Sequence, residues 1–122
     1  MASGKFRSLI QPAEIGAVGD APIYACRAWV NFDGTGTVAI RASGNVSSIT
    51  DIGVGTYKVN FITAMPDVNY TVFGMSMLNR IVAYSSTTFD TGVQGVGAVN
   101  IRVCDTAAAA KDEQCVNVAI FR

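Results

Sequence analysis

The chain has 122 residues, the size of one domain with little room for a second. Nine basic residues balance nine acidic ones, so the positive charge that nucleic-acid binding needs is missing. Histidine is absent too, which removes the commonest general base and the usual metal ligand. Only 15% of the residues are charged and half are apolar, a composition that indicates a small domain burying part of its surface in an assembly.

The apolar residues are of the kinds found in β-strands. Valine occurs 15 times and isoleucine 10 times, whereas leucine occurs only twice. Twelve glycines supply turns between short apolar runs. We therefore predict an all-β fold of about eight short strands, either an antiparallel sandwich or a barrel. No apolar run approaches the length of a membrane span and the N-terminus lacks a signal peptide, so we expect assembly in the cytoplasm without membrane insertion.

The first 23 residues differ from the rest of the chain. They lack the alternation of a strand, so we predict an irregular arm over residues 1–23 and a folded module over residues 24–122. Scattered apolar residues in the arm indicate that it docks on another surface. These residues are Leu9, Ile10, Ile15 and Val18.

The first predicted strand, residues 24–32, has two different faces. Its apolar face consists of Tyr24, Cys26, Ala28, Val30 and Phe32. Cys26 is accordingly interpreted as a buried thiol. Trp29 lies on the opposite face, where it is either covered, as in a central strand or an interface, or exposed as a platform on which a sugar could stack.

Turn residues divide the remaining chain into pairs of strands. The predicted pairs are 24–32 with 36–42, 45–52 with 56–62, 69–77 with 80–84, and 98–104 with 115–121. The last pair would form a terminal hairpin and could bring Cys104 and Cys115 within reach of a disulfide. The four alanines between those strands are predicted to form one or two helical turns capped by Asp105 or Thr106.

The loop of the last predicted hairpin, residues 105–114, is the candidate contact site. It is long for a hairpin loop, and long loops on a rigid sheet commonly carry recognition. We therefore choose Lys111, Asp112 and Glu113 as candidate partner-contact residues. The alternative is that the loop caps the end of the sandwich or packs on a neighbouring subunit.

No catalytic, cofactor or metal site is predicted. The carboxylates fall mostly in turns, where they bind local backbone donors, and the three cysteines lack metal-ligand spacing. The glycine pattern of residues 34–39 matches a dinucleotide fingerprint only formally, because a strand follows where a helix is required. Met65, Met75 and Met77 are interpreted as side chains that fill gaps in the core.

Four runs of the chain together form a distinctive pattern, at residues 29–42, 43–51, 57–61 and 64–70. These runs resemble a β-rich module of tailed-bacteriophage tail fibre and other virion proteins, and the likeness is close over residues 26–73. The resemblance implies a non-enzymatic virion protein, with a tail fibre head in host attachment as the first reading. A capsid decoration protein whose arm docks on the capsid is the alternative, and a glycan-processing enzyme is a third.

The expected partners follow from the composition and the resemblance together. We expect a homotrimer, because few charged side chains are available to cover the surface. The arm would contact other virion proteins, and the host partner would be a surface glycan or an outer-membrane protein.

Overall fold

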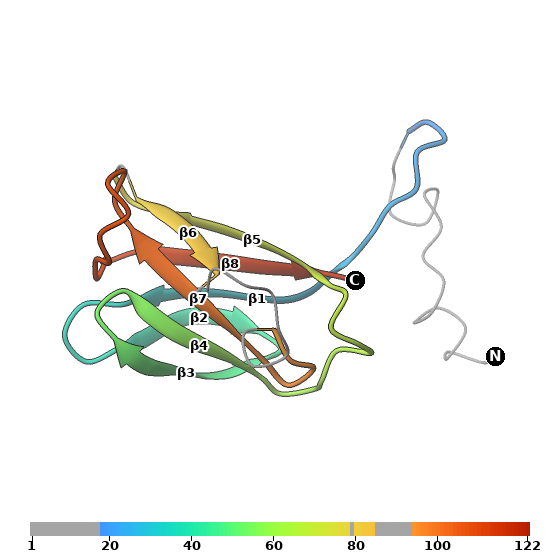
Figure 1. Cartoon of the computed structure of the whole chain (residues 1–122). Helices are drawn as coiled ribbons and strands as arrows, with labels where there is room; N and C mark the ends of the chain where they lie inside the picture. The colour runs from blue at the N-terminus through green and yellow to red at the C-terminus, as the bar shows by residue number, and fades with distance from the viewer. Residues whose placement is uncertain (1–17, 79, 85–93) are drawn as a thin grey trace.

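The computed structural model describes residues 18–78, 80–84 and 94–122, and within these ranges the chain contains strands and turns but no helix. Eight strands form two four-stranded antiparallel sheets that pack as a sandwich (Figure 1). Sheet A has the order β2-β1-β8-β5, and sheet B the order β3-β4-β7-β6. The strand bounds are β1 Cys26–Asp33, β2 Ala39–Gly44, β3 Val46–Gly53, β4 Thr56–Phe61, β5 Thr71–Ser76, β6 Ile81–Tyr84, β7 Ala98–Cys104 and β8 Val116–Phe121. The described residues include no helix that could span a membrane.

Two of the predicted hairpins are confirmed and two are wrong. The β1–β2 and β3–β4 pairs form as expected. However, β5 and β6 lie in different sheets, as do β7 and β8. Instead, β8 pairs with both β1 and β5, and β7 pairs with β4 and β6. Alternation in a sequence identifies the buried face of a strand, but it does not identify the strand's neighbour, so the chain's crossings between the sheets were missed.

The core lies between the inner faces of the two sheets. Phe32 of sheet A and Tyr57 of sheet B are both fully buried, and their rings meet edge to face with centroids 5.1 Å apart. The strictest alternation occurs in β4, β7 and β8. Their inward side chains are Tyr57, Val59, Phe61, Val99, Ile101, Val103, Val116, Val118 and Ile120. The pattern that predicted strands therefore also identified the core.

The start of β1 departs from the prediction. Ala28, Val30 and Phe32 are buried as expected, whereas Tyr24 is 74% exposed and Cys26 is exposed as well. A bulge between Cys26 and Ala28 breaks the register with β8, so the alternation does not extend back to Cys26. The prediction of a buried thiol at Cys26 is wrong for this reason.

The other two cysteines lie on different sheets. Cys104 ends β7 of sheet B and is buried, and Cys115 precedes β8 of sheet A and is half-buried. The structure contains both as thiols, without the disulfide that a terminal hairpin would have allowed.

The corner between β2 and β3, where the chain changes sheets, is fixed by one side chain. Asn45 has a φ of 55°, in the left-handed region that asparagine tolerates better than most residues. Its amide nitrogen donates hydrogen bonds to the carbonyl oxygens of Arg27 and Thr63, and its amide oxygen accepts one from the Thr63 N–H. Asn45 thus joins the start of β1 to the residue that follows the end of β4 by two positions, Thr63.

An ion pair ties the C-terminus to the loop between β4 and β5. The Arg122 guanidinium donates to both carboxylate oxygens of Asp67, at 2.9 and 2.7 Å. These bonds, with a further one from the Asn69 N–H, lower the pKa of Asp67 to about 2. Because the folded state favours the ionised carboxyl, the pair stabilises the fold above the unfolded pKa near 4, and this stabilisation is lost as the pH falls toward 2.

Replacing Asp67 with Asn is therefore expected to lower the melting temperature near neutral pH but to have a diminishing effect as the pH approaches 2. Thermal unfolding followed by circular dichroism at several pH values measures this difference. Asp20→Asn, in the exposed segment before β1, serves as the control. An Asp67→Asn effect that is equal at all pH values would contradict the proposed role of the ion pair.

Candidate functional site

The loop of residues 105–114 closes one end of the sandwich. Because it joins β7 of sheet B to β8 of sheet A, it crosses between the sheets. The Lys111 N–H donates to the Val103 carbonyl at 2.9 Å, and the Val103 N–H donates to the Gly55 carbonyl at 2.6 Å. The backbone of Lys111 is thus bound to the last residues of β7, beside the β3–β4 turn.

Asp112 joins this loop to the buried tyrosine. Its Oδ1 accepts hydrogen bonds from the Tyr57 hydroxyl and the Gly55 N–H, each at 2.8 Å. The same hydroxyl lies 3.0 Å from the Gly34 carbonyl oxygen, to which it also donates. Burial, reinforced by the bond to Asp112, raises the pKa of Tyr57 well above its usual value, so this hydroxyl stays protonated and acts as a donor.

Glu113 is the most deeply buried of the three predicted contact residues. Its side chain forms an ion pair with Arg80 at 3.4 Å, and its carbonyl oxygen accepts a hydrogen bond from the Gly34 N–H at 2.8 Å. Only 7% of Glu113 is exposed. The structure therefore brings Lys111, Asp112 and Glu113 together as a cap on the sandwich, the alternative role considered for this loop, and their role as partner contacts stays a prediction.

The tip of the loop, residues 106–109, is its longest exposed stretch, and Asp112 and Gln114 are exposed as well. The Asp105 carboxylate accepts hydrogen bonds from the Ala107 and Ala109 N–H groups at 2.9 and 3.0 Å. Ala108 has a φ of 65°, which ends any helical path. The predicted helical turns, and with them a helix cap at Asp105 or Thr106, are therefore wrong, and the Asp105 carboxylate instead binds backbone N–H groups of the loop tip.

Replacing Tyr57 with Phe removes the hydroxyl and keeps the ring against Phe32. We expect a loss of about 1–2 kcal/mol in the free energy of unfolding, because the buried Gly34 carbonyl and Asp112 lose their donor. Urea denaturation measures it. Tyr24→Phe, at an exposed tyrosine, is the matched control and is expected to be neutral. Equal unfolding midpoints for the two variants would show that the hydroxyl does not anchor the loop.

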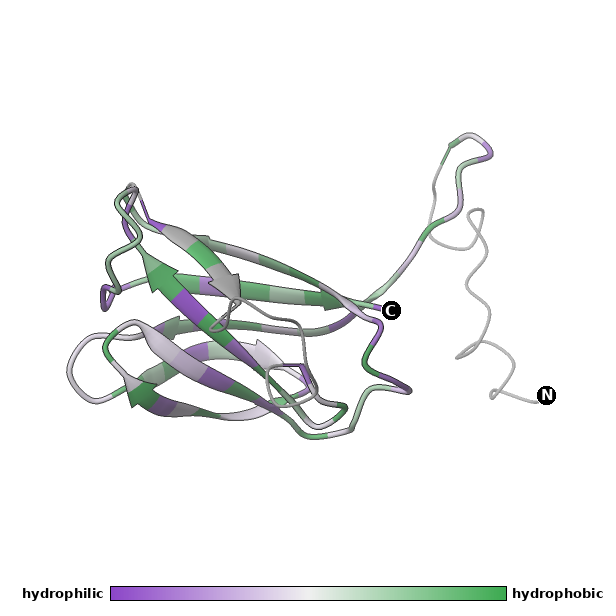
Figure 2. Ribbon diagram, in the orientation of Figure 1, coloured by the Kyte–Doolittle hydropathy of each residue, from purple (hydrophilic) through white to green (hydrophobic). Residues whose placement is uncertain are grey.

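The outer faces of the two sheets differ in chemistry. Along β3, β4 and β7, where the structure describes the side chains, sheet B presents polar side chains outward, and hydrophilic positions alternate with hydrophobic ones along β4 and β7 (Figure 2). These outward residues are Ser48, Thr50, Lys58, Asn60, Asn100 and Arg102. Sheet A instead presents Trp29, Phe73 and Met75, which are 44%, 61% and 71% exposed. The outer face of sheet A is thus apolar on both sides of its central strand β8.

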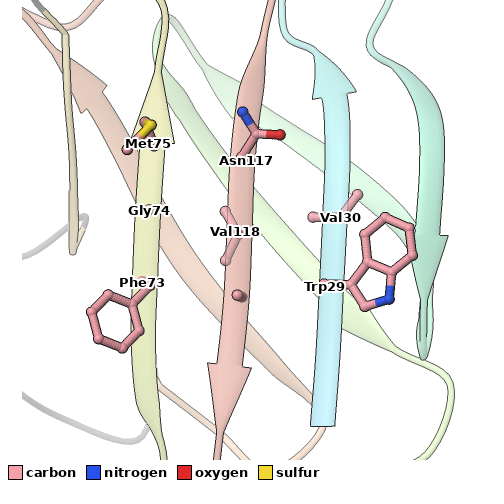
Figure 3. A pocket seen from close by; sticks show the side chains of 8 residues that line it. Trp29, Val30, Phe73, Gly74, Met75, Asn117 and Val118 are labelled. Carbon is pink, nitrogen blue, oxygen red and sulfur yellow. The ribbon is translucent and has the colours of Figure 1, made fainter. Parts of the chain in front are cut away.

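A shallow groove of about 330 Å³ runs over β8 on this face. Trp29 of β1 and Phe73 of β5 both stand opposite Ala119, so a small residue lies between two aromatic ones. Figure 3 shows the two rings turned away from each other, the indole toward β2 and the phenyl beyond β5. Met75 and Asn117 line the same groove. The groove is therefore floored by β8 and open to solvent.

Neighbouring residues hold both aromatic rings. The Trp29 indole lies over Gly44 of β2, so closely that a Cβ at residue 44 would overlap the ring nitrogen. Phe73 meets Phe121 edge to face, with ring centroids 5.9 Å apart. The rings of Trp29 and Phe73 are consequently held by residues that do not themselves line the groove.

A polar strip borders the groove. The Asn31 amide donates to the Asn117 side chain at 2.6 Å, and Arg41 lies 3.4 Å from Asn31 and 3.7 Å from Asp33. Hydrogen bonds from Thr35 lower the pKa of Asp33, with a smaller contribution from Arg41. Because this strip lies at the border and Asn117 is the only polar side chain of the groove lining itself, an apolar ligand suits the groove better than a sugar.

The sequence revealed only part of this surface. Trp29 was placed correctly on the face opposite the buried stripe of β1. It is 44% exposed in the single chain, so cover at an interface and exposure as a platform both stay predictions. Met65 is buried as predicted, but Met75 and Met77 are exposed, so their interpretation as core residues is wrong. Phe73 and Ala119 were missed because their contact depends on the β5–β8 pairing. The alternation within residues 69–77 places Phe73, Met75 and Met77 on one face, but it does not indicate that this apolar face points outward.

Among the described residues, no three cysteine, aspartate or glutamate side chains gather as metal ligands would. No protein-family model, curated protein or solved structure matches the chain.

Proposed function

We propose that this protein is a non-enzymatic structural module of a tailed-phage virion, a tail fibre head that acts in host attachment. The observation that carries the proposal is the apolar outer face of sheet A, with Trp29, Phe73 and Met75 exposed, in contrast to the polar face of sheet B. A single chain that leaves aromatic side chains on one sheet face is suited to assembly with other subunits. This face would contact neighbouring virion subunits.

The loop of residues 105–114 would then form the host-contacting end. Its base is bound to the sandwich through Asp112 and Glu113, and its tip at residues 106–109 is exposed. Recognition by a loop benefits from such fixed geometry, because little conformational entropy is lost on binding. The host partner would be a surface glycan or an outer-membrane protein.

A capsid decoration protein is the second candidate, and the segment before β1 favours it. Val18 is fully exposed and Tyr24 largely so. Residues 18–25 lead away from the sandwich, as the blue trace in Figure 1 shows. An arm that leaves its own domain is suited to docking on another surface, such as a capsid shell.

Immunogold labelling of virions from cells that carry this gene distinguishes the two candidates. A tail fibre head should place gold at the tail end of each particle, whereas a decoration protein should place gold over the capsid. Antibody bound to a fibre head should also block adsorption to host cells. Particles without gold, from lysates that contain the folded protein, would contradict a virion role altogether.

The apolar face can be tested in the same particles. Met75→Ser is expected to reduce incorporation into virions, because it removes an exposed apolar contact from sheet A. Ile62→Ser is the matched control, since Ile62 is 70% exposed but lies directly after β4 of sheet B, away from the sheet A face. Quantitative immunoblotting of purified particles measures incorporation. Equal loss for both variants, or for neither, would remove the sheet A face from the assembly surface.

A further inference from the structure

The groove on sheet A has the shape of a site for an extended apolar segment. Its floor is β8 and its walls are Trp29 and Phe73, which stand on the two strands flanking β8. Two interstrand spacings separate those strands, about 10 Å. That width accepts one extended chain with an apolar side chain directed at Ala119. The lining includes a single polar side chain, Asn117, which is bonded to Asn31.

The chain itself carries a segment of matching chemistry. Residues 9–18 contain four large aliphatic residues and a single charged one, Glu14. The aliphatic residues are Leu9, Ile10, Ile15 and Val18. Pro12 and Gly16 interrupt this segment, so it is unsuited to a regular helix and suited to an extended path.

The residues that connect the arm to β1, from Val18 onward, indicate the direction in which the arm leaves the sandwich. Val18, its last aliphatic residue, is fully exposed, and Tyr24 is 74% exposed. The connection from Val18 to β1 therefore does not lie on its own sandwich. Residues 9–18 can span about 30 Å when extended, enough to reach a second copy.

We propose that the aliphatic arm of one copy occupies the sheet A groove of a neighbouring copy. Leu9 and Ile15 of the donor, which fall on one side of an extended segment, would cover Trp29, Phe73 and Met75 of the acceptor. Each copy both donates an arm and accepts one, so the exchange can close a ring such as a trimer. The inference concerns self-assembly, and it holds or fails independently of any role in a virion.

Trp29 is a reporter built into the proposed site, because it is the only tryptophan of the chain and is 44% exposed. Arm exchange predicts that raising the concentration of the full-length protein shifts Trp29 emission to shorter wavelength and reduces quenching by acrylamide. Light scattering should detect an oligomer over the same concentration range. Protected emission from a monomer would indicate docking within one chain, and an oligomer with accessible Trp29 would indicate another interface. Either result would overturn the proposal, as would a monomer with accessible Trp29 at every concentration.

Arm variants test the donor. Leu9→Ser, Ile10→Ser and Ile15→Ser together should leave the circular dichroism unchanged and weaken association by about a hundredfold or more, since at least two buried aliphatic side chains are lost and each contributes about tenfold. The matched control replaces Ser8, Gln11 and Glu14 with Ala and should associate at least as well as the original chain. Phe73→Ser tests the acceptor, with Ile62→Ser as its control. Association that is unchanged by either the arm or the groove substitutions would overturn the proposal.

A mixing experiment tests donation between copies directly. The triple-serine arm variant keeps its tryptophan, and Trp29→Phe copies with intact arms are invisible to tryptophan fluorescence. Adding excess Trp29→Phe chain should protect Trp29 of the arm variant. Adding a Trp29→Phe chain that also carries the three arm substitutions should have no effect. Protection by both chains, or by neither, would contradict exchange of the arm.

Discussion

The buried hydroxyl group of Tyr57 is the point on which one end of this sandwich depends. It donates to Asp112 and to the Gly34 carbonyl, so a strand of sheet B is joined to the β1–β2 turn of sheet A and to the β7–β8 loop. A hydroxyl in an apolar core is costly unless it is bonded, and here its bonds also stabilise the β1–β2 turn and the β7–β8 loop. The base of the candidate contact loop, residues 105–114, is consequently a structural part of the sandwich.

At the opposite end, buried polar groups stabilise the connections in the same way. The Gln94 amide, almost fully buried, donates to the Val68 and Tyr70 carbonyl oxygens, and the Tyr70 hydroxyl bonds to the Gly95 carbonyl at 2.7 Å. The two ends of the sandwich are thus fixed by tyrosine hydroxyls and amides, while the middle is purely aliphatic and aromatic. Because the core and the two ends hold the sandwich together, the outer faces of the sheets can differ in polarity. The outer face of sheet A is the one with exposed aromatic side chains.

The sequence predicted the positions of the strands better than it predicted which strands pair. Alternation located all eight strands and the inward residues of β4, β7 and β8, because burial on one face has a period of two. It could not show that β8 lies between β1 and β5, since strand order depends on how the chain crosses between sheets. The groove was not predicted for the same reason. Trp29, Ala119 and Phe73 come from three strands, and only the strand pairing brings them into one row. The burial of Glu113 was also missed, because charge in a loop ordinarily indicates exposure.

The contact between Trp29 and Gly44 has a consequence for related sequences. Residue 44 lies under the indole, and any side chain there would displace the ring from the edge of the groove. A sequence that keeps tryptophan at this position of β1 is therefore constrained to keep glycine at its partner in β2, although glycine weakens a strand. Loss of the tryptophan would lift the constraint and allow a β-branched residue at position 44, so the two positions should change together during divergence.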